Sequence, residues 1–462
     1  MKSNKIIALL SFLLIPALAF AQNWTQDTTF VPVEGDSFFE VHGVAVDGEG
    51  RVWVQQYYWN QADLVVQRDL NGDGMANDTV TSSAIYIYNQ DGTPADFSPL
   101  QTIEYEDESM PADTLYRRWD GESYEALSGR GIEADQNGDI IISSFDQLIK
   151  VDHQSVKAVA KVVVNGASLT EASTDSDGNI YVSNVAATDA PIYKFDSNLE
   201  NPEELVTLTS GFSRDFQVSA DGNTIWWAGY TGKTVLKYTR PDEFSGFSAT
   251  PDTVLRGFAA ESFDIHPVTG YLWVGSGSLN DVPEAPYQPQ TWYAFDTSTL
   301  GTDNEVPLDS IRWTPGADVS AGYDNARPRG LDFSADGKTA FLGGFSGLET
   351  DVDVQKFTTD QVFTSNENEG ISDVPKGYEL QQNYPNPFNP TTNINYSINE
   401  SGAVTLKVYD MTGREVATLV NERMSAGSHQ VQFDASNLSS GVYIYSLQAN
   451  GVRLTNKMTL IK

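Results

Sequence analysis

Apolar and polar residues alternate in short runs through residues 23–363, and no long run follows the 3.6-residue period of a helix. One phrase recurs: alternating residues, then Asp or Ser, a tight turn with Gly, and a run rich in β-branched and aromatic residues. Its six copies are HGVAVDGEGRVWVQ (42–55), RGIEADQNGDIIIS (130–143), TEASTDSDGNIYVS (170–183), RDFQVSADGNTIWWA (214–228), ESFDIHPVTGYLWVG (261–275) and RGLDFSADGKTAFLG (329–343). The pattern predicts six β-hairpins in an all-β fold.

Further strand-like runs follow most hairpins. Third strands are predicted at 147–152, 191–196, 234–239, 291–296 and 353–358, and fourth strands at 158–164, 203–208, 252–256 and 309–313. Four strands in a repeat of this length are typical of β-propeller blades, so we expect six blades. The last copy has no fourth strand, but TTFVPV (28–33) precedes the first copy. We therefore expect this N-terminal strand to complete the sixth blade and leave no open sheet edge.

The blade phrases, for example PRGLDFSADGKTAFLGG (328–344), resemble the NHL, SMP-30 and YVTN-type group of six-bladed propellers. The resemblance covers 23–363 and implies the fold, while binding proteins and enzymes both carry it.

Aromatic residues recur at one position after the Gly turn: Trp53, Tyr181, Trp226, Trp273 and Phe341, with Ile141 in the second copy. This recurrence predicts packing between blades. The aromatics at 57–59 and the pair Tyr287 and Trp292 lie outside the register, and we interpret them as candidates for stacking on a carbohydrate.

The first residue of each phrase is expected at the mouth of the central channel. Three of the six are arginines in a region with few basic residues, and acidic residues occupy this position or the next in three copies. The candidate ligand-binding residues are His42, Arg130, Glu171, Arg214, Asp215, Glu261 and Arg329. Because Arg binds carboxylate or sulfate bidentately, the mouth could hold an acidic small molecule or glycan. The alternative is that the arginines pair with Glu171, Asp215 and Glu261 of neighbouring blades and join the ring.

A metal-dependent hydrolase is the other functional hypothesis. Glu171, Asp215 and Glu261 come from three consecutive blades, and SMP-30-like lactonases assemble a divalent-metal site in this way. No catalytic base or G-x-S-x-G motif is evident, and the four histidines are scattered. Convergence of the three carboxylates on one point would favour the hydrolase, and pairing with the arginines would favour a binding protein.

An insertion of roughly 60–125 follows the first hairpin and contains RDLNGDGMANDT (68–79). Its oxygen-rich spacing resembles a Ca²⁺ loop, although Val80 stands where an EF-hand has Glu. The candidate ligands are Asp69, Asn71, Asp73, Met75 (backbone carbonyl), Asn77 and Asp78. We expect a structural calcium ion, with a solvated Asx-rich turn as the alternative.

Charge and cysteine content exclude several classes of partner. The 462-residue chain has a net charge of −35 and no cysteine. Residues 22–375 hold 19 Lys and Arg against 57 Asp and Glu. Such a surface repels phosphate backbones and anionic lipids, so we expect neither nucleic acid nor membrane-surface binding. Disulfides and thiolate metal sites are ruled out.

The ends of the chain predict export. Lys2 and Lys5 precede an apolar run and Ala19-Phe20-Ala21, the pattern of a cleavable signal peptide at 1–21, so no membrane insertion is expected after cleavage. A polar linker is predicted at 364–377, and six or seven short strands beyond it predict an Ig-like β-sandwich.

The segment YELQQNYPNPFNPTTNINYSI, with LKVYDMTGREVATLV, AGSHQVQFDASNLSSGVYIYSLQ and the terminal KMTLIK, resembles a type A C-terminal sorting domain of the type IX secretion (Por) system. The resemblance covers 378–462. It implies a Bacteroidota source, recognition by the type IX machinery, removal by a sortase-like peptidase, and delivery through the periplasm to the cell surface or medium. We expect Tyr384 and Phe388 to fix the extended NYPNPFNPTT segment against the sandwich.

The sequence thus predicts an exported β-propeller that acts as a binding or scaffold protein, with the metal-dependent hydrolase as the alternative.

Overall fold

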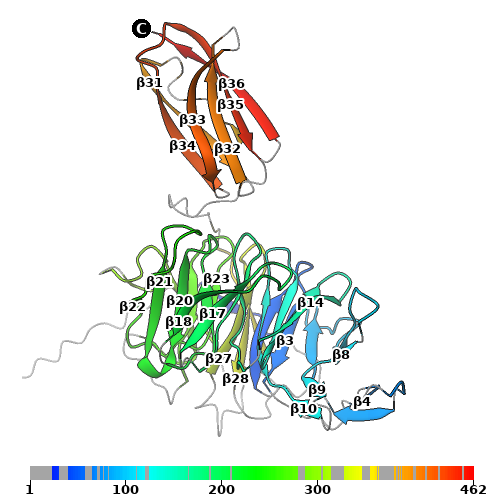
Figure 1. The fold of residues 1–462 in the computed structure, drawn as a ribbon. Helices are drawn as coiled ribbons and strands as arrows, with labels where there is room; N and C mark the ends of the chain where they lie inside the picture. The colour runs from blue at the N-terminus through cyan, green and yellow to red at the C-terminus, as the bar shows by residue number, and fades with distance from the viewer. Residues whose placement is uncertain are drawn as a thin grey trace, which may run out of the picture. The chain divides into compact units, whose positions relative to one another are not determined.

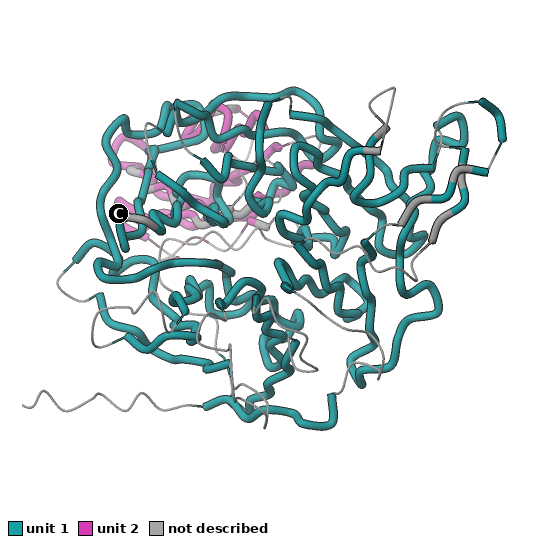
Figure 2. The backbone as a smooth tube through the Cα atoms, turned by 90° about the horizontal axis from the view of Figure 1, so that it is seen from below, with its two compact units in different colours: residues 1–366 teal, residues 367–462 magenta. Residues whose placement is uncertain are grey.

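The computed structural model describes residues 23–461 apart from internal segments, the longest of which are 31–39, 279–286, 314–326, 346–353 and 364–378. The predicted signal peptide therefore lies outside the described residues. The chain divides into two compact units, Met1–Asn366 and Glu367–Lys462 (Figure 2). The division falls within the segment predicted as a linker.

In the described residues, the first unit contains six antiparallel sheets of three or four strands and three smaller two-stranded sheets, β4-β5, β7-β8 and β9-β10. The six larger sheets follow one another along the chain (Figure 1). The first sheet is β2 (Val41–Val46), β3 (Val52–Gln56) and β6 (Ile85–Tyr88). The second is β11 (Gly129–Ala134), β12 (Ile140–Ser144), β13 (Gln147–Asp152) and β14 (Lys157–Val163). The third is β15 (Ser173–Thr174), β16 (Ile180–Val182), β17 (Ala190–Phe195) and β18 (Glu203–Leu208).

The fourth sheet is β19 (Phe216–Val218), β20 (Thr224–Gly229), β21 (Thr234–Thr239) and β22 (Asp252–Val254), with the 3₁₀ turn η1 (Tyr230–Gly232) between its middle strands. The fifth is β23 (Phe263–Ile265), β24 (Leu272–Gly275), β25 (Thr291–Phe295) and β26 (Asp309–Arg312). The sixth is β27 (Arg327–Phe333), β28 (Thr339–Phe345), β29 (Val354–Thr358) and β1 (Thr25–Gln26).

The innermost strands contact one another in cyclic order: β2, β11, β15, β19, β23, β27 and again β2. Six apolar clusters follow the same cycle, each shared by two neighbouring sheets. The all-β, propeller-type architecture predicted from the repeats is confirmed. Six blades is the interpretation that we give to these six sheets.

The recurrent aromatic position is buried between sheets, as predicted. Trp53, Tyr181 and Phe341 have no exposed surface, and Trp226 and Trp273 are at most 3% exposed. Two of them also bind the acid before their turn: Trp53 Nε1 donates to Asp47 and Tyr181 Oη donates to Asp175. The proposed stacking role of Trp292 is wrong, because Trp292 lies in β25, is fully buried and donates to Ser262. Tyr287 packs against Phe258, and residues 58–59 lie outside the described residues.

Two boundaries differ from the prediction. The N-terminal strand does complete the sixth sheet, but it is β1, which pairs Thr25 with Thr358, and residues 28–29 form a turn. The insertion assigned to 60–125 contains β6, which is the third strand of the first sheet. The rest of that range includes β4 (Val65–Arg68), β5 (Asp78–Thr81), β7 (Thr102–Ile103), β8 (Asp113–Thr114), β9 (Arg117–Trp119) and β10 (Tyr124–Ala126).

The second unit consists of two sheets around one apolar core. One sheet is β30 (Glu379–Leu380), β31 (Thr391–Ile398) and β34 (Gly427–Asp434), and the other is β33 (Glu415–Met424), β32 (Gly402–Tyr409), β35 (Gly441–Ala449) and β36 (Val452–Leu460). The Ig-like classification stays a prediction.

Phe388 is 2% exposed and joins the core of this unit, as expected, while Tyr384 lies outside the described residues. Asn383 is a second anchor that the sequence did not suggest. Its backbone N–H donates to Tyr445 and its side-chain amide donates to Thr392.

Candidate functional site

The inner strands begin with an irregularity that places extra side chains at one end. The pairing of β2, β11 and β27 with their neighbours shifts by one residue at His42, Arg130 and Arg329. A β-bulge of this kind leaves its extra residue out of the ladder and redirects its side chain. Three of the predicted mouth residues thus owe their position to a bulge.

The glycine after each bulge allows the inner strands to approach closely. Gly131 has φ +139°, and a Cβ atom there would lie 2.3 Å from Cβ of Glu171 in the next sheet. The bulge and the close approach therefore require glycine at this position.

Of the three predicted ion pairs, the one between Arg329 and Glu261 forms. Nε of Arg329 lies 2.9 Å from Oε2 of Glu261, and Nε of Arg327 lies 3.5 Å from Oε1 of the same carboxylate. Nη1 of Arg329 donates to Nε2 of His42 at 3.2 Å. His42 is the acceptor in this contact because burial, together with the positive charges of Arg329, Arg214 and Arg130, holds its pKa well below the ordinary value.

Arg130 and Arg214 do not form the predicted ion pairs and lie instead over aromatic rings. The guanidinium carbon of Arg130 is 5.3 Å from the Tyr57 ring centre and 5.5 Å from that of Phe145. That of Arg214 is 4.6 Å from the Phe212 ring centre. These are cation–π distances. The Nε atoms of both arginines are buried without a hydrogen-bond partner, and Arg130 is 6% exposed.

We call His42, Arg130, Arg214, Glu261, Arg327 and Arg329 the arginine cluster. Burial lowers the pKa of Arg130 and of Arg214, and neighbouring arginines lower both further. Burial and repulsion from Arg214 and Arg327 outweigh the attraction of Glu261 and lower the pKa of Arg329 to about 10. The cluster carries four arginines, and Glu261 is the carboxylate that pairs with them in the described part of the chain. An added anion would relieve this excess of buried positive charge.

Glu171 and Asp215 belong to a different set of residues. Asp215 accepts backbone N–H groups from Phe216 and from Phe263 of the next sheet, both at 2.6 Å. Glu171 accepts the N–H of Ile132 in the preceding sheet at 3.3 Å. Burial raises the pKa of Glu171 well above its ordinary value, and that of Asp215 to about 7. Their assignment to pairs with Arg130 and Arg214 is wrong, because backbone amides of adjacent strands take up their oxygens.

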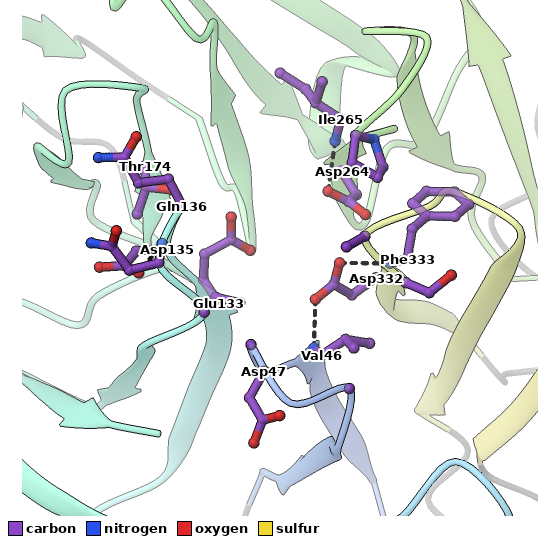
Figure 3. A pocket seen from close by; sticks show the side chains of 18 of the residues that line it. Val46, Asp47, Glu133, Asp135, Gln136, Thr174, Asp264, Ile265, Asp332 and Phe333 are labelled. Atoms are coloured by element: carbon purple, nitrogen blue, oxygen red, sulfur yellow. Dashed lines mark hydrogen bonds between the residues drawn. The ribbon is translucent and has the colours of Figure 1, made fainter. Parts of the chain in front are cut away.

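Three further acids complete this set: Glu133, Asp264 and Asp332. We call these five the acidic cluster. Glu133, Asp264 and Asp332 line a cavity of about 890 Å³ (Figure 3). Sequence reasoning missed them, although each stands three residues after the arginine-cluster residue of its own phrase, so extending the alignment by one inward-facing position would have found them.

The geometry does not bring Glu171, Asp215 and Glu261 to one point. Among the described residues, one group of three has ligand atoms within 4.8 Å of one another: Asp139, Asp152 and His153. Within it, Nδ1 of His153 lies 2.9 Å from Asp139, and the Lys150 ammonium lies 3.8 Å from the same carboxylate. The three carboxylates therefore do not converge as the hydrolase hypothesis requires.

The candidate calcium loop is held by its own backbone. The Asp69 carboxylate accepts the N–H groups of Asp73 and Gly74, and Asp73 accepts that of Met75. The carbonyl of Met75 accepts the N–H of Asn77. Asn71 and the side chain of Asp78 lie outside the described residues. These bonds are those of an Asx-type turn.

Comparison with known proteins defines the C-terminal unit. Residues 382–462 match the family model of the secretion system C-terminal sorting domain. The chain ends in a type IX sorting domain. The protein is accordingly exported, either to the cell surface or into the medium. Within the described residues, no helix has the length and apolar character needed to cross a bilayer.

No curated protein sequence matches this chain. Among solved structures, a gluconolactonase from Xanthomonas campestris matches at 13% identity and a TM-score of 0.41, covering 70% of this chain and 87% of its own. Virginiamycin B lyase from Staphylococcus aureus matches at 11% identity and a TM-score of 0.40, covering 72% and 99%. Likenesses at these scores add nothing to what the sheets themselves show.

Proposed function

We propose that this exported protein is a binding protein, and that its arginine cluster holds the carboxylate or sulfate group of an acidic small molecule or glycan. The observation that carries the proposal is Arg130. Its guanidinium is buried, stacked on two aromatic rings, and has an Nε donor without a partner. A buried donor without a partner costs free energy that a bound acceptor recovers.

The aromatic rings support the same proposal. Tyr57 and Phe345 surround His42, with ring centres 5.4 and 5.9 Å from the imidazole. Aromatic faces beside charge-selective donors suit a ligand with an apolar face and an anionic group, as uronic acids and sulfated sugars have.

Isothermal titration of the purified protein against acidic and neutral oligosaccharides of equal length tests this. Arg130→Gln and Arg214→Gln should each weaken binding of the acidic ligand by about 10-fold or more, since a charge-assisted hydrogen bond is lost. Arg256→Gln removes the same charge from an exposed site and should change affinity by less than about 2-fold. Equal binding of acidic and neutral ligands, or unchanged affinity in both cluster variants, would contradict the proposal.

For export, we propose that the type IX machinery recognises the sorting domain and that a sortase-like peptidase then removes it in a Bacteroidota host. Deletion of 378–462 should leave the protein in the periplasm. Mass spectrometry of surface or released protein should find a C-terminus upstream of Tyr378. Intact residues 378–462 on the delivered protein would contradict the cleavage step, and normal delivery of the truncated chain would contradict recognition.

We also propose that the 68–79 loop binds a structural calcium ion. Four oxygen-bearing candidate residues lie in the described part of this tight, exposed loop: Asp69, Asp73, Asn77 and the backbone of Met75. Calcium should raise the melting temperature of the protein, and Asp73→Ala should abolish that increase. An equal increase in the melting temperature of the variant would mean that calcium binds elsewhere in the protein.

A further inference from the structure

The cavity of about 890 Å³ is lined by acids and by no described basic residue. Its acidic residues are Asp47, Glu49, Glu133, Asp135, Asp175, Asp264, Asp332 and Asp336. The volume falls in the range of pockets that bind small molecules. The charge excludes anions and selects cations.

Several of these acids already have partners. Asp47 pairs with Arg51 at 2.6 Å, and Asp135 pairs with Lys150 at 2.7 Å. Asp175 accepts the hydroxyl of Tyr181 and the side-chain amide of Asn179. Their charges are therefore balanced or hydrogen-bonded within the protein.

Asp264 differs from these residues. It is 9% exposed, its Oδ1 accepts the N–H of Ile265 at 2.6 Å, and its Oδ2 is buried without a hydrogen-bond partner (Figure 3). Asp332, which faces the same cavity, accepts backbone N–H groups from Val46 and Phe333, both at 2.6 Å. Burial and the surrounding acids raise the pKa of Asp264 and of Glu133 well above ordinary values. An unsatisfied carboxylate oxygen among repelling acids favours a positively charged partner.

The spacing of the acids indicates what kind of cation fits. Glu133, Asp264 and Asp332 do not form a group with oxygens all within 4.8 Å, which is the reach expected around one metal ion. Cationic nitrogens spread along a carbon chain can reach separated carboxylates, and the cavity has room for such a chain. We propose that this cavity binds an organic cation with two or more ammonium groups, of the polyamine class, with Asp264, Glu133 and Asp332 as its counter-charges.

Titration with spermidine tests the inference. The purified protein should bind it, and Asp264→Asn should weaken its affinity about 10-fold or more while the backbone bond to Ile265 can still form. Asp336→Asn is the matched control, because Asp336 lines the same cavity but is exposed and accepts bonds from Ser334 and Lys338. It should change affinity by less than about 2-fold.

If Asp264→Asn does not fold, Glu133→Gln gives an independent variant. It should weaken spermidine binding in the same way. Absence of spermidine binding, or equal affinity in wild type and the folded cavity variants, would overturn the inference. If calcium displaces spermidine, and if Asp264→Asn abolishes calcium binding, the result would also overturn the inference and would favour a metal site. Titration of the same variants with the acidic oligosaccharide distinguishes an effect on the cavity from an effect on the arginine cluster.

Discussion

The arginine cluster and the acidic cavity lie at different levels of the same inner strands, yet they differ in charge and in how that charge is stabilised. Asp332 stands three positions after Arg329, and Glu133 stands three positions after Arg130. At the arginine level, guanidinium groups are held by aromatic rings and by Glu261. At the acidic level, Asp332 accepts the backbone N–H of Val46 on the adjacent strand. Glu171 and Asp215 of the acidic cluster are held in the same way by Ile132 and Phe263. A ring of inner strands can therefore carry two selective sites at once, because successive inward-facing positions are independent.

The largest expected effect is at Glu261. Glu261→Ala should destabilise the protein by about 3–5 kcal/mol, because Arg329 would remain buried with its carboxylate partner removed. Urea unfolding monitored by tryptophan fluorescence measures this change. The matched removal of an acid at the other level, Asp264→Asn, should not destabilise the fold. Losses of similar size in both variants would contradict the contrast between the two levels.

Gly131 lies between the two levels and should be nearly as sensitive. Gly131→Ala should cost about 2–3 kcal/mol, since the new Cβ would meet Glu171 and the residue would keep a left-handed φ. Thermal unfolding measures the loss. Gly166→Ala, at φ +75° with no atom within 4 Å, carries the backbone strain without the contact and should cost less.

The acidic cluster should make the protein less stable as pH rises. Asp215 and Asp332 have folded pKa values of about 7 against about 3.8 in the unfolded chain, so they bind more protons when folded. Their contribution to stability is complete below about pH 4 and is lost as pH rises to about 7. Urea unfolding between pH 5 and 8 should show declining stability, with a shallower decline in Asp332→Asn. The arginines keep their charge over this range, so a slope that disappears in Arg130→Gln would contradict the assignment.

The smallest effect should be a stabilisation. Asp264→Asn removes one charge from a set of repelling acids and should raise the free energy of unfolding at pH 8 by about 1 kcal/mol without ligand. Differential scanning calorimetry can detect it. Spermidine should then stabilise wild type more than the variant. If Asp264→Asn were less stable than wild type, Asp264 would stabilise its strand and would not be a ligand-binding residue of the cavity.

Local patterns in the sequence predicted the strands and the packing of the recurrent aromatics, because alternation and the Gly turn act within one hairpin. They did not predict which partner each charged side chain takes. Arg130 and Arg214 lie over aromatic rings, and Glu171 and Asp215 accept backbone N–H groups. A bulge and a close approach of the strands decide the direction of each side chain. The stacking role of Trp292 was wrong although Trp292 falls in the strand predicted at 291–296, because the sequence pattern does not show that both faces of this strand are buried. Glu133, Asp264 and Asp332 do not stand out in the sequence because the other three copies carry Ala45, Ser173 and Gln217 at the same position.

The pairing of β1 with β29 has a consequence for the order of folding. Thr25 is synthesised before the other five large sheets of this unit, whereas Thr358, its partner, is synthesised after them. The edge of the sixth sheet thus stays open until β29 has been synthesised, and long-range pairing of this kind makes ring closure a late step in the folding of this unit. The sorting domain begins a short distance beyond Thr358, so the signal for delivery is synthesised just after the strand that allows the ring to close.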